Sequence, residues 1–177
     1  MGCEKLQKIC ENIGSDVTFM LRGGLGRLRG KGDDVEHFQL ISPLYFALTT
    51  FEEELSSREV YAAFDNIMQP TNAKKLQRLQ SENDKLLTLL AQGAIERALT
   101  HFSNDIQQAA ASISDYADKY LNFTKAKGLN AVMTGSGSAY YIPFQSRTEA
   151  EKTVNMLTFC GFSSILCQSV PRGIEII

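Results

Sequence analysis

Two short apolar runs, 131–133 and 139–142, are separated by the tetrapeptide Gly-Ser-Gly-Ser at positions 135–138. Glycine and serine are typical of tight turns, so this pattern predicts a β-hairpin over 131–142 whose two strands pair in antiparallel fashion. Gly135 and Gly137 permit positive φ angles, and consecutive backbone N–H groups in such a turn can form a concave site for an anion. A purely conformational role for the turn is the alternative.

The segments around this hairpin alternate between strand and helix patterns from Pro43 onward. The predicted elements are a strand at 44–49, helices at 56–64, 73–92, 94–102 and 103–125, the hairpin, a helix at 146–159, a strand at 164–167 and a terminal strand at 174–177. Ser-x-x-Glu capping boxes at 56–59 and 146–149 mark two of the helix starts. This βαββαβ order with added helices predicts an α+β, ferredoxin-like fold in which an antiparallel sheet carries helices on one face.

Residues 1–42 do not fit that unit. An amphipathic helix is predicted at 4–13, and the apolar run 17–21 predicts a short buried strand, which places Asp16 at a helix-to-strand junction. The glycine-rich segment 22–32 predicts edge strands and a turn, and it matches neither the GxGxxG nor the P-loop pattern. We therefore expect the end of one domain at 1–42 and a second domain at 43–177.

The composition excludes several classes of protein. Hydrophobic residues make up 44% and charged residues 21%, which is typical of a globular chain, and the net charge of −2 provides no basic field for nucleic acid. No apolar stretch approaches about 18 residues, and the start of the chain lacks a signal-peptide pattern. We expect a cytoplasmic protein with no nucleic-acid or membrane partner. The cysteines at 3, 10, 160 and 167 match no zinc or redox spacing, so buried free thiols and no protein-ligated metal are expected.

The predicted helix 73–92 carries leucines at helical spacing, with Asn83 among them. Two heptads are too few for a coiled coil, so a core-facing helix is favoured over a strip that forms a homodimer. The leucines are Leu76, Leu79, Leu86, Leu87 and Leu90.

Several short motifs resemble one family of enzymes. In order, they are similar to the "GSDVPFF…GG…GRGxGE", "STxEVY", "FNDLE" and "MSGSGS" segments of the 4-diphosphocytidyl-2-C-methyl-D-erythritol kinases, which belong to the GHMP family of small-molecule kinases. Their order and spacing are more specific than any one motif, and they span almost the whole chain. The matching segments here are GSDVTFM (14–20), GG (23–24), RGKG (29–32), SSREVY (56–61), FSNDI (102–106, with one inserted residue) and MTGSGS (133–138).

The resemblance implies phosphoryl transfer from ATP, with Mg²⁺, to the 2-hydroxyl of a small-molecule substrate, the cytidine diphosphate derivative of methylerythritol. That reaction is a step of non-mevalonate isoprenoid biosynthesis. Asp16 matches the family's aspartate beside the accepting hydroxyl, where it acts as a base or orienting group. Gly135, Ser136, Gly137 and Ser138 match the turn that shapes the nucleotide-binding region.

The departures from the family pattern are equally informative. The family's first third has no counterpart here, including its phosphate-cradling glycine-serine loop and the lysine that partners the aspartate. Thr18 replaces a proline, and Glu52-Glu53-Glu54 stands where the family tends to have a Pro-Gly turn. We therefore expect a diverged C-terminal portion of such a kinase, with little turnover alone. The alternatives are a non-catalytic ferredoxin-like binding or dimerisation module, and another GHMP kinase that acts on homoserine, mevalonate or a sugar.

Overall fold

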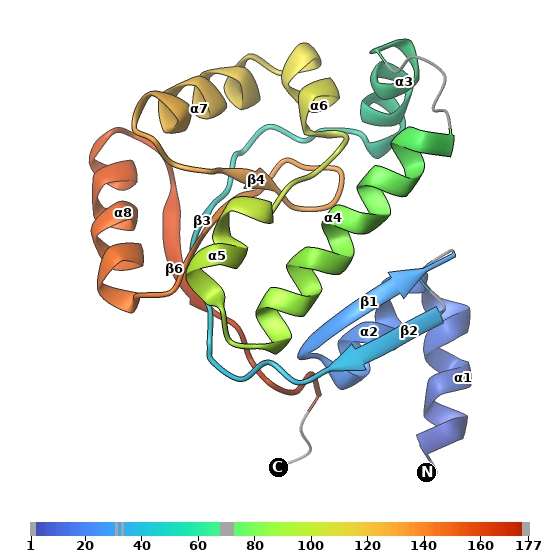
Figure 1. Ribbon diagram of the computed structural model, residues 1–177. Coiled ribbons are helices and arrows are strands. Elements are labelled where there is room, and N and C mark those ends of the chain that lie inside the picture. The colour runs from blue at the N-terminus through green and yellow to red at the C-terminus, as the bar shows by residue number, and fades with distance from the viewer. Residues whose placement is uncertain (1–2, 31, 33, 68–72, 175–177) are drawn as a thin grey trace.

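The computed structural model describes residues 3–30, 32, 34–67 and 73–174 (Figure 1). Its helices are α1 (Cys3–Ile13), α2 (Ser15–Arg22), α3 (Ser57–Ile67), α4 (Ala73–Ala91), α5 (Ile95–Ala98), the 3₁₀ turn η1 (Leu99–His101), α6 (Gln107–Ile113), α7 (Asp115–Ala126) and α8 (Arg147–Phe159). Its strands are β1 (Leu25–Arg29), β2 (Asp34–Phe38), β3 (Tyr45–Thr49), β4 (Val132–Met133), β5 (Tyr140–Phe144) and β6 (Ser164–Gln168). None of the helices in these ranges is long and apolar enough to cross a membrane.

The larger sheet has four strands in the order β4-β5-β3-β6, and every neighbouring pair is antiparallel. The central strand β3 pairs with both β5 and β6, so that Tyr45 lies opposite Phe144 on one side and Gln168 on the other. Because the first and third strands of the βαββαβ unit are central, this is the ferredoxin-like arrangement. The structure confirms the predicted α+β fold.

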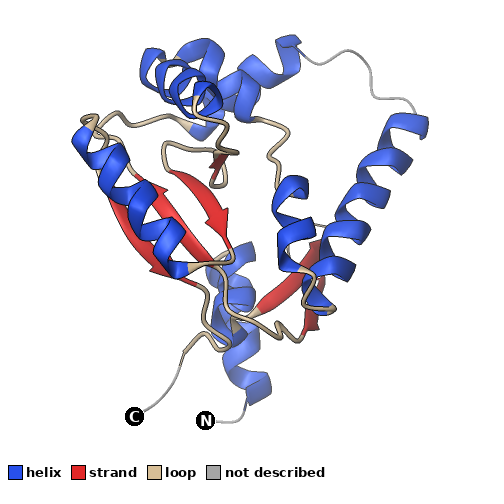
Figure 2. Ribbon diagram, turned by 60° about the vertical axis from the view of Figure 1, so that its left-hand side comes forward, coloured by secondary structure: helices blue, strands red, loops and turns tan. Residues whose placement is uncertain are grey.

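Alternation along β3 divides the core between the two faces of this sheet. Ala47 belongs to the larger buried cluster, which lies between the sheet and helices α3, α6, α7 and α8 (Figure 2). Phe46 points to the opposite face and packs with a second cluster built from Leu44, α4 and α5. Leu87 and Leu90 are both buried, and Leu90 belongs to this second cluster, so the core-facing prediction for this helix is confirmed at its C-terminal half. The side chain of Leu76 lies outside the described part of the chain.

The first 38 residues fold differently from the prediction in one segment. Residues 17–21, predicted as a strand, belong to helix α2. An apolar run of five residues carries too little periodicity to distinguish strand from helix, so tertiary contacts decide. The ring of Phe19 stacks on His37 of β2, with centroids 6.1 Å apart. Strands β1 and β2 form a separate two-stranded sheet, in which Leu25 lies opposite Phe38.

The predicted helix 103–125 is interrupted. It consists of α6 and α7, separated by Ser114, whose side chain accepts a hydrogen bond from Ala117 N at 3.1 Å and so caps α7. At the start of α8, Ser146 acts as the N-cap, since its Oγ accepts from Glu149 N at 3.4 Å.

The last described residues return to α2 (Figure 1). Gly173 N donates to Arg22 O at 2.8 Å, and Ile174 N donates to Leu21 O at 3.4 Å. The predicted terminal strand at 174–177 falls almost wholly outside the described residues.

Candidate functional site

The glycine-serine turn connects β4 to β5 and is closed by backbone hydrogen bonds. Thr134 N donates to Ala139 O at 2.9 Å, and Gly137 N donates to Thr134 O at 2.9 Å. Gly135 has a φ of 51° and Gly137 a φ of 99°, so both glycines adopt the positive φ values that the sequence predicted. The second value lies outside the small left-handed region open to other residues. The turn therefore depends on glycine at position 137.

Asn104 holds this turn in place from the loop before α6. Its side-chain amide donates to Met133 O at 2.9 Å and to Gly135 O at 2.8 Å, while its Oδ1 accepts from Ile106 N at 3.0 Å. Gln107 adds a further bond, because its Oε1 accepts from Met133 N at 2.7 Å. From the sequence, this asparagine is placed only at the start of the predicted helix 103–125. Its place in the FSNDI motif is the signal that could have identified it.

A third motif reaches the turn from the start of α3. The hydroxyls of Ser57 and Ser136 share a hydrogen bond of 2.6 Å. Leu55, just before this helix, lies where a Cβ on Gly137 would meet it at 3.1 Å. The structure thus brings together the segments 56–61, 102–106 and 133–138, which are far apart in the sequence.

The turn presents free hydrogen-bond donors. Within the described residues, the backbone N–H groups of Gly135, Ser136 and Ser138 have no protein acceptor. Gly135 is exposed, and the other two residues are half-buried. Backbone N–H groups gathered on a short turn form a suitable site for a phosphate oxygen. The chemistry available here is anion binding.

Asp16 lies in a different part of the molecule. It is exposed in the first turn of α2, which packs against α1 and lies beside the β1–β2 hairpin (Figure 1). At this end of a helix the unpaired N–H groups give a partial positive charge, which favours a carboxylate. The structure joins the turn to α3 and Asn104, and places Asp16 among another set of elements.

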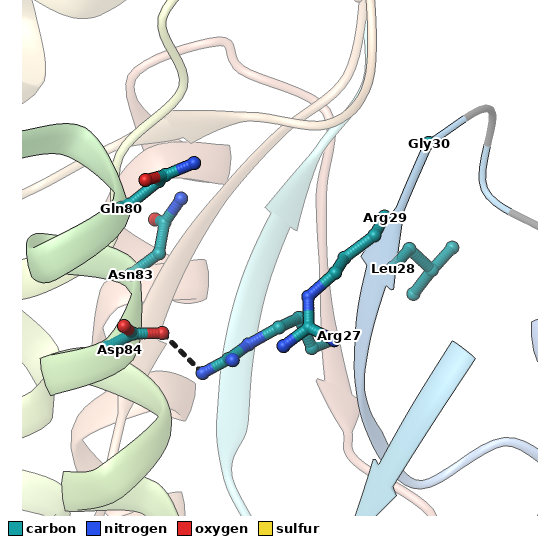
Figure 3. Close-up of a pocket in the computed structure, with 7 residues that line it drawn as sticks. All are labelled: Arg27, Leu28, Arg29, Gly30, Gln80, Asn83 and Asp84. Atoms are coloured by element: carbon teal, nitrogen blue, oxygen red, sulfur yellow. Dashed lines mark ion pairs between the residues drawn. The ribbon is translucent and has the colours of Figure 1, made fainter. Parts of the chain in front are cut away.

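A cleft of about 570 Å³ separates β1 from α4 (Figure 3). Arg27 reaches across it from β1, and its Nη2 forms an ion pair of 2.5 Å with Asp84 Oδ1 of α4. Arg29, on the same strand, pairs with Glu36 at 3.1 Å. Both guanidinium groups thus have carboxylate partners, so the cleft is no strong anion site. Neither Asp16 nor the turn at 135–138 lines it.

The described residues contain no group of three or more His, Cys, Asp or Glu side chains that could hold a metal ion.

Residues 84–161 match the family model for the C-terminal part of GHMP kinases. This stretch is therefore similar to the C-terminal domain of GHMP kinases. The resemblance noted in the sequence is therefore confirmed. The match covers α5 to α8 and includes both Asn104 and the glycine-serine turn.

Curated relatives extend this similarity toward the start of the chain. The chain is 25% identical over 177 residues to a 4-diphosphocytidyl-2-C-methyl-D-erythritol kinase of Caldanaerobacter subterraneus subsp. tengcongensis, with 98% of this chain and 58% of the relative covered. A protein of the same name from Cutibacterium acnes is 30% identical over 135 residues, which cover 76% of this chain and 42% of the relative. The chain thus spans about half the length of these relatives.

Solved structures share the fold. A crystal structure of 4-(cytidine 5'-diphospho)-2C-methyl-D-erythritol kinase gives a TM-score of 0.66 at 20% identity and covers 93% of this chain and 56% of its own. Homoserine kinase from Cytophaga hutchinsonii gives the same TM-score of 0.66 at 16% identity, covering 89% of this chain and 51% of its own. The fold is common to kinases with different acceptors.

Proposed function

We propose that this chain corresponds to the C-terminal portion of an ATP-dependent kinase that phosphorylates the 2-hydroxyl of 4-diphosphocytidyl-2-C-methyl-D-erythritol. In this proposal residues 1–42 end the N-terminal kinase domain and residues 43–177 form the C-terminal one. The observation that carries it is the convergence of three family motifs on a turn with free N–H donors. The names of the curated relatives support the choice of acceptor.

The turn at 135–138 is proposed to lie against the nucleotide phosphates. Phosphoryl transfer needs little covalent chemistry from the protein, so catalysis comes mostly from positioning and from stabilising charge on the transferring group. Preorganised N–H donors do this without reorganising during the reaction. Asn104 and Ser57 would act as positioning residues, because they hold the turn rather than touch the nucleotide.

Asp16 is proposed as the base or orienting group for the accepting hydroxyl. A positioned general base typically contributes about 10²–10⁴-fold to the rate. Mg²⁺ would neutralise phosphate charge when it is bound with the nucleotide.

The two alternatives differ in their support. The homoserine kinase structure matches as well as the cytidyl-kinase structure, so the fold does not discriminate between acceptors and another GHMP kinase activity stays open. A dimerisation module that uses α4 is less favoured, because Leu87 and Leu90 are buried inside the chain.

The deciding experiment measures ATP-dependent phosphorylation of diphosphocytidyl-methylerythritol. The samples are this chain, its Asp16→Asn variant, and each of the two supplemented with an N-terminal segment of a family kinase. We expect activity in one sample alone, the chain that retains Asp16 and is supplemented with the N-terminal segment. Activity that survives Asp16→Asn would exclude this residue as the base. Homoserine is assayed in parallel as a second acceptor, and phosphorylation of homoserine without phosphorylation of diphosphocytidyl-methylerythritol would reassign the acceptor.

A second experiment tests the turn by nucleotide binding. Asn104→Asp removes both amide donors and places a carboxylate beside two carbonyl oxygens, so we expect weaker ATP binding by the supplemented chain. Asn130→Asp is the matched control, because the Asn130 amide also bridges two carbonyls, those of Leu99 and Phe102. Equal losses in the two variants would show that Asn104 acts through general stability alone.

A further inference from the structure

A second cavity, of about 490 Å³, opens on the β6 side of the larger sheet. It is lined by residues 51–53 after β3, by Tyr116 and Lys119 on α7, and by residues 160–163 between α8 and β6. None of the residues assigned to the kinase site lines it. The feature is therefore separate from the proposed function and does not rest on it.

The walls of this cavity are aromatic. Phe51 and Tyr116 lie with ring centroids 6.4 Å apart, and Phe162 completes the lining. Behind them the rings continue into the core, because Tyr120 contacts both Phe51 and Phe162, with centroids 5.5 Å and 5.1 Å away. A wall continuous with the packed core stays in place when a ligand arrives, which lowers the entropic cost of binding.

The charged residues of the lining are Glu52, Glu53 and Lys119, which together carry one net negative charge. The carboxylate of Glu53 is held by a hydrogen bond from Ser114 Oγ, the same hydroxyl that caps α7. Glu52 is exposed and remains free to orient toward a ligand. These glutamates belong to the acidic run that replaces the family's Pro-Gly turn, and the proposed kinase reaction gives that run no role.

We infer that this cavity binds a small organic cation, a quaternary ammonium or amine. Aromatic ring faces attract cations electrostatically, and carboxylates beside them supply the counter-charge. An anion would be repelled by two carboxylates here, and a neutral ligand would gain no charge–charge attraction from them. The ammonium group of Lys119 belongs to the same lining and offsets part of the charge of the two carboxylates. Lys119 therefore competes with a cationic ligand for these carboxylates.

Choline and its neutral isostere 3,3-dimethyl-1-butanol test the inference directly. The two probes have nearly the same shape and differ in charge, so titration followed by NMR chemical shifts separates cation recognition from apolar filling. We expect saturable choline binding that shifts resonances of residues 51–53, 116 and 160–163. The neutral isostere should bind more weakly by a factor of about five or more. Equal binding of both probes, or no saturable choline binding, would overturn the inference.

Three variants assign the effect to the cavity. Glu52→Gln should weaken choline binding, whereas Glu54→Gln removes the same charge from an exposed neighbour that does not line the cavity and should change it less. Lys119→Gln should strengthen binding, because it removes the competing cation. Equal effects of the two glutamate variants would point to a general electrostatic effect and count against a built site. All three side chains are exposed, so folding should be preserved.

Discussion

The two glycines of the 135–138 turn differ in what they tolerate. Gly135 has a φ of 51°, within the left-handed region, and a Cβ added there would meet nothing within 4 Å. Gly137 has a φ of 99°, and a Cβ there would meet Leu55 Cδ1 at 3.1 Å and Met133 Sδ at 3.2 Å. The second glycine is thus required by both backbone conformation and space.

Alanine substitutions should separate these two requirements. Gly135→Ala should lower the free energy of unfolding by about 1 kcal/mol, because only the left-handed backbone is penalised. Gly137→Ala should lower it by roughly 2 kcal/mol or more, since crowding adds to backbone strain. Urea unfolding followed by circular dichroism measures both. The same loss in the two variants would contradict the crowding argument.

Two buried tyrosines make another matched pair. Tyr120 OH shares a hydrogen bond of 2.9 Å with Thr49 Oγ1, whereas the hydroxyl of Tyr140 has no partner among the described residues. Tyr120→Phe should therefore lower the free energy of unfolding by about 1 kcal/mol. Tyr140→Phe should leave it unchanged or raise it, because an unsatisfied buried hydroxyl is removed. A clear destabilisation by Tyr140→Phe would show that this hydroxyl has a partner.

At the level of elements, the break between α6 and α7 depends on Ser114. This buried serine caps α7 and also donates to Glu53, so one hydroxyl joins a helix start to the loop after β3. The apolar pattern of 103–125 continues through the break, which is why the sequence predicted one helix.

Ser114→Ala should lower the free energy of unfolding by about 1–2 kcal/mol, the usual effect of losing a helix N-cap. Ser112→Ala is the control, because Ser112 is exposed and its hydroxyl bonds only the nearby Ala109 O, so a change within about 0.5 kcal/mol is expected. Thermal or urea unfolding measures both variants. A negligible effect at position 114 would mean that α7 begins without its cap.

For the whole molecule, the end of the described chain packs directly on α2. A Cβ on Gly173 would come within 2.9 Å of the carbonyl carbon of Met20 and still closer to its oxygen, so only glycine fits there. Gly173→Ala should displace this segment and speed amide hydrogen exchange at positions 173 and 174. Gly14→Ala is the control, since its φ of 174° is extended and its nearest contact, at 3.6 Å, is ordinary. Unchanged exchange in Gly173→Ala would contradict the close packing.

Alkaline pH should destabilise the whole fold. Burial raises the pKa of Tyr120, Tyr140 and Tyr141 to about 12, above the value of 10.0 for an exposed tyrosine. The folded state therefore holds these protons more tightly, so the stabilisation is complete below pH 10 and is lost as pH rises toward 12. Circular dichroism and tyrosinate absorbance over this range should show unfolding coupled to ionisation. Ionisation of all tyrosines near pH 10 with the fold intact would contradict this.

Much of the fold and part of the candidate site follow from the sequence alone. Strand β3, helices α3, α4 and α8, and the hairpin at 131–142 were predicted because capping boxes, glycine punctuation and apolar periodicity are local signals. The requirement for positive φ at Gly135 and Gly137 was local in the same way. The order of these elements was then enough to predict the ferredoxin-like sheet.

Other features were decided only by tertiary contacts. Residues 17–21 lie in a helix whose Phe19 stacks on His37 of β2, a partner that a short apolar run does not specify. Asn104 became the support of the turn because its amide lies between two carbonyls of another segment. The aromatic and acidic cavity likewise gathers residues from three separate stretches. Local sequence determines the elements and their turns, whereas side-chain partners distant in the chain are selected only when those elements pack.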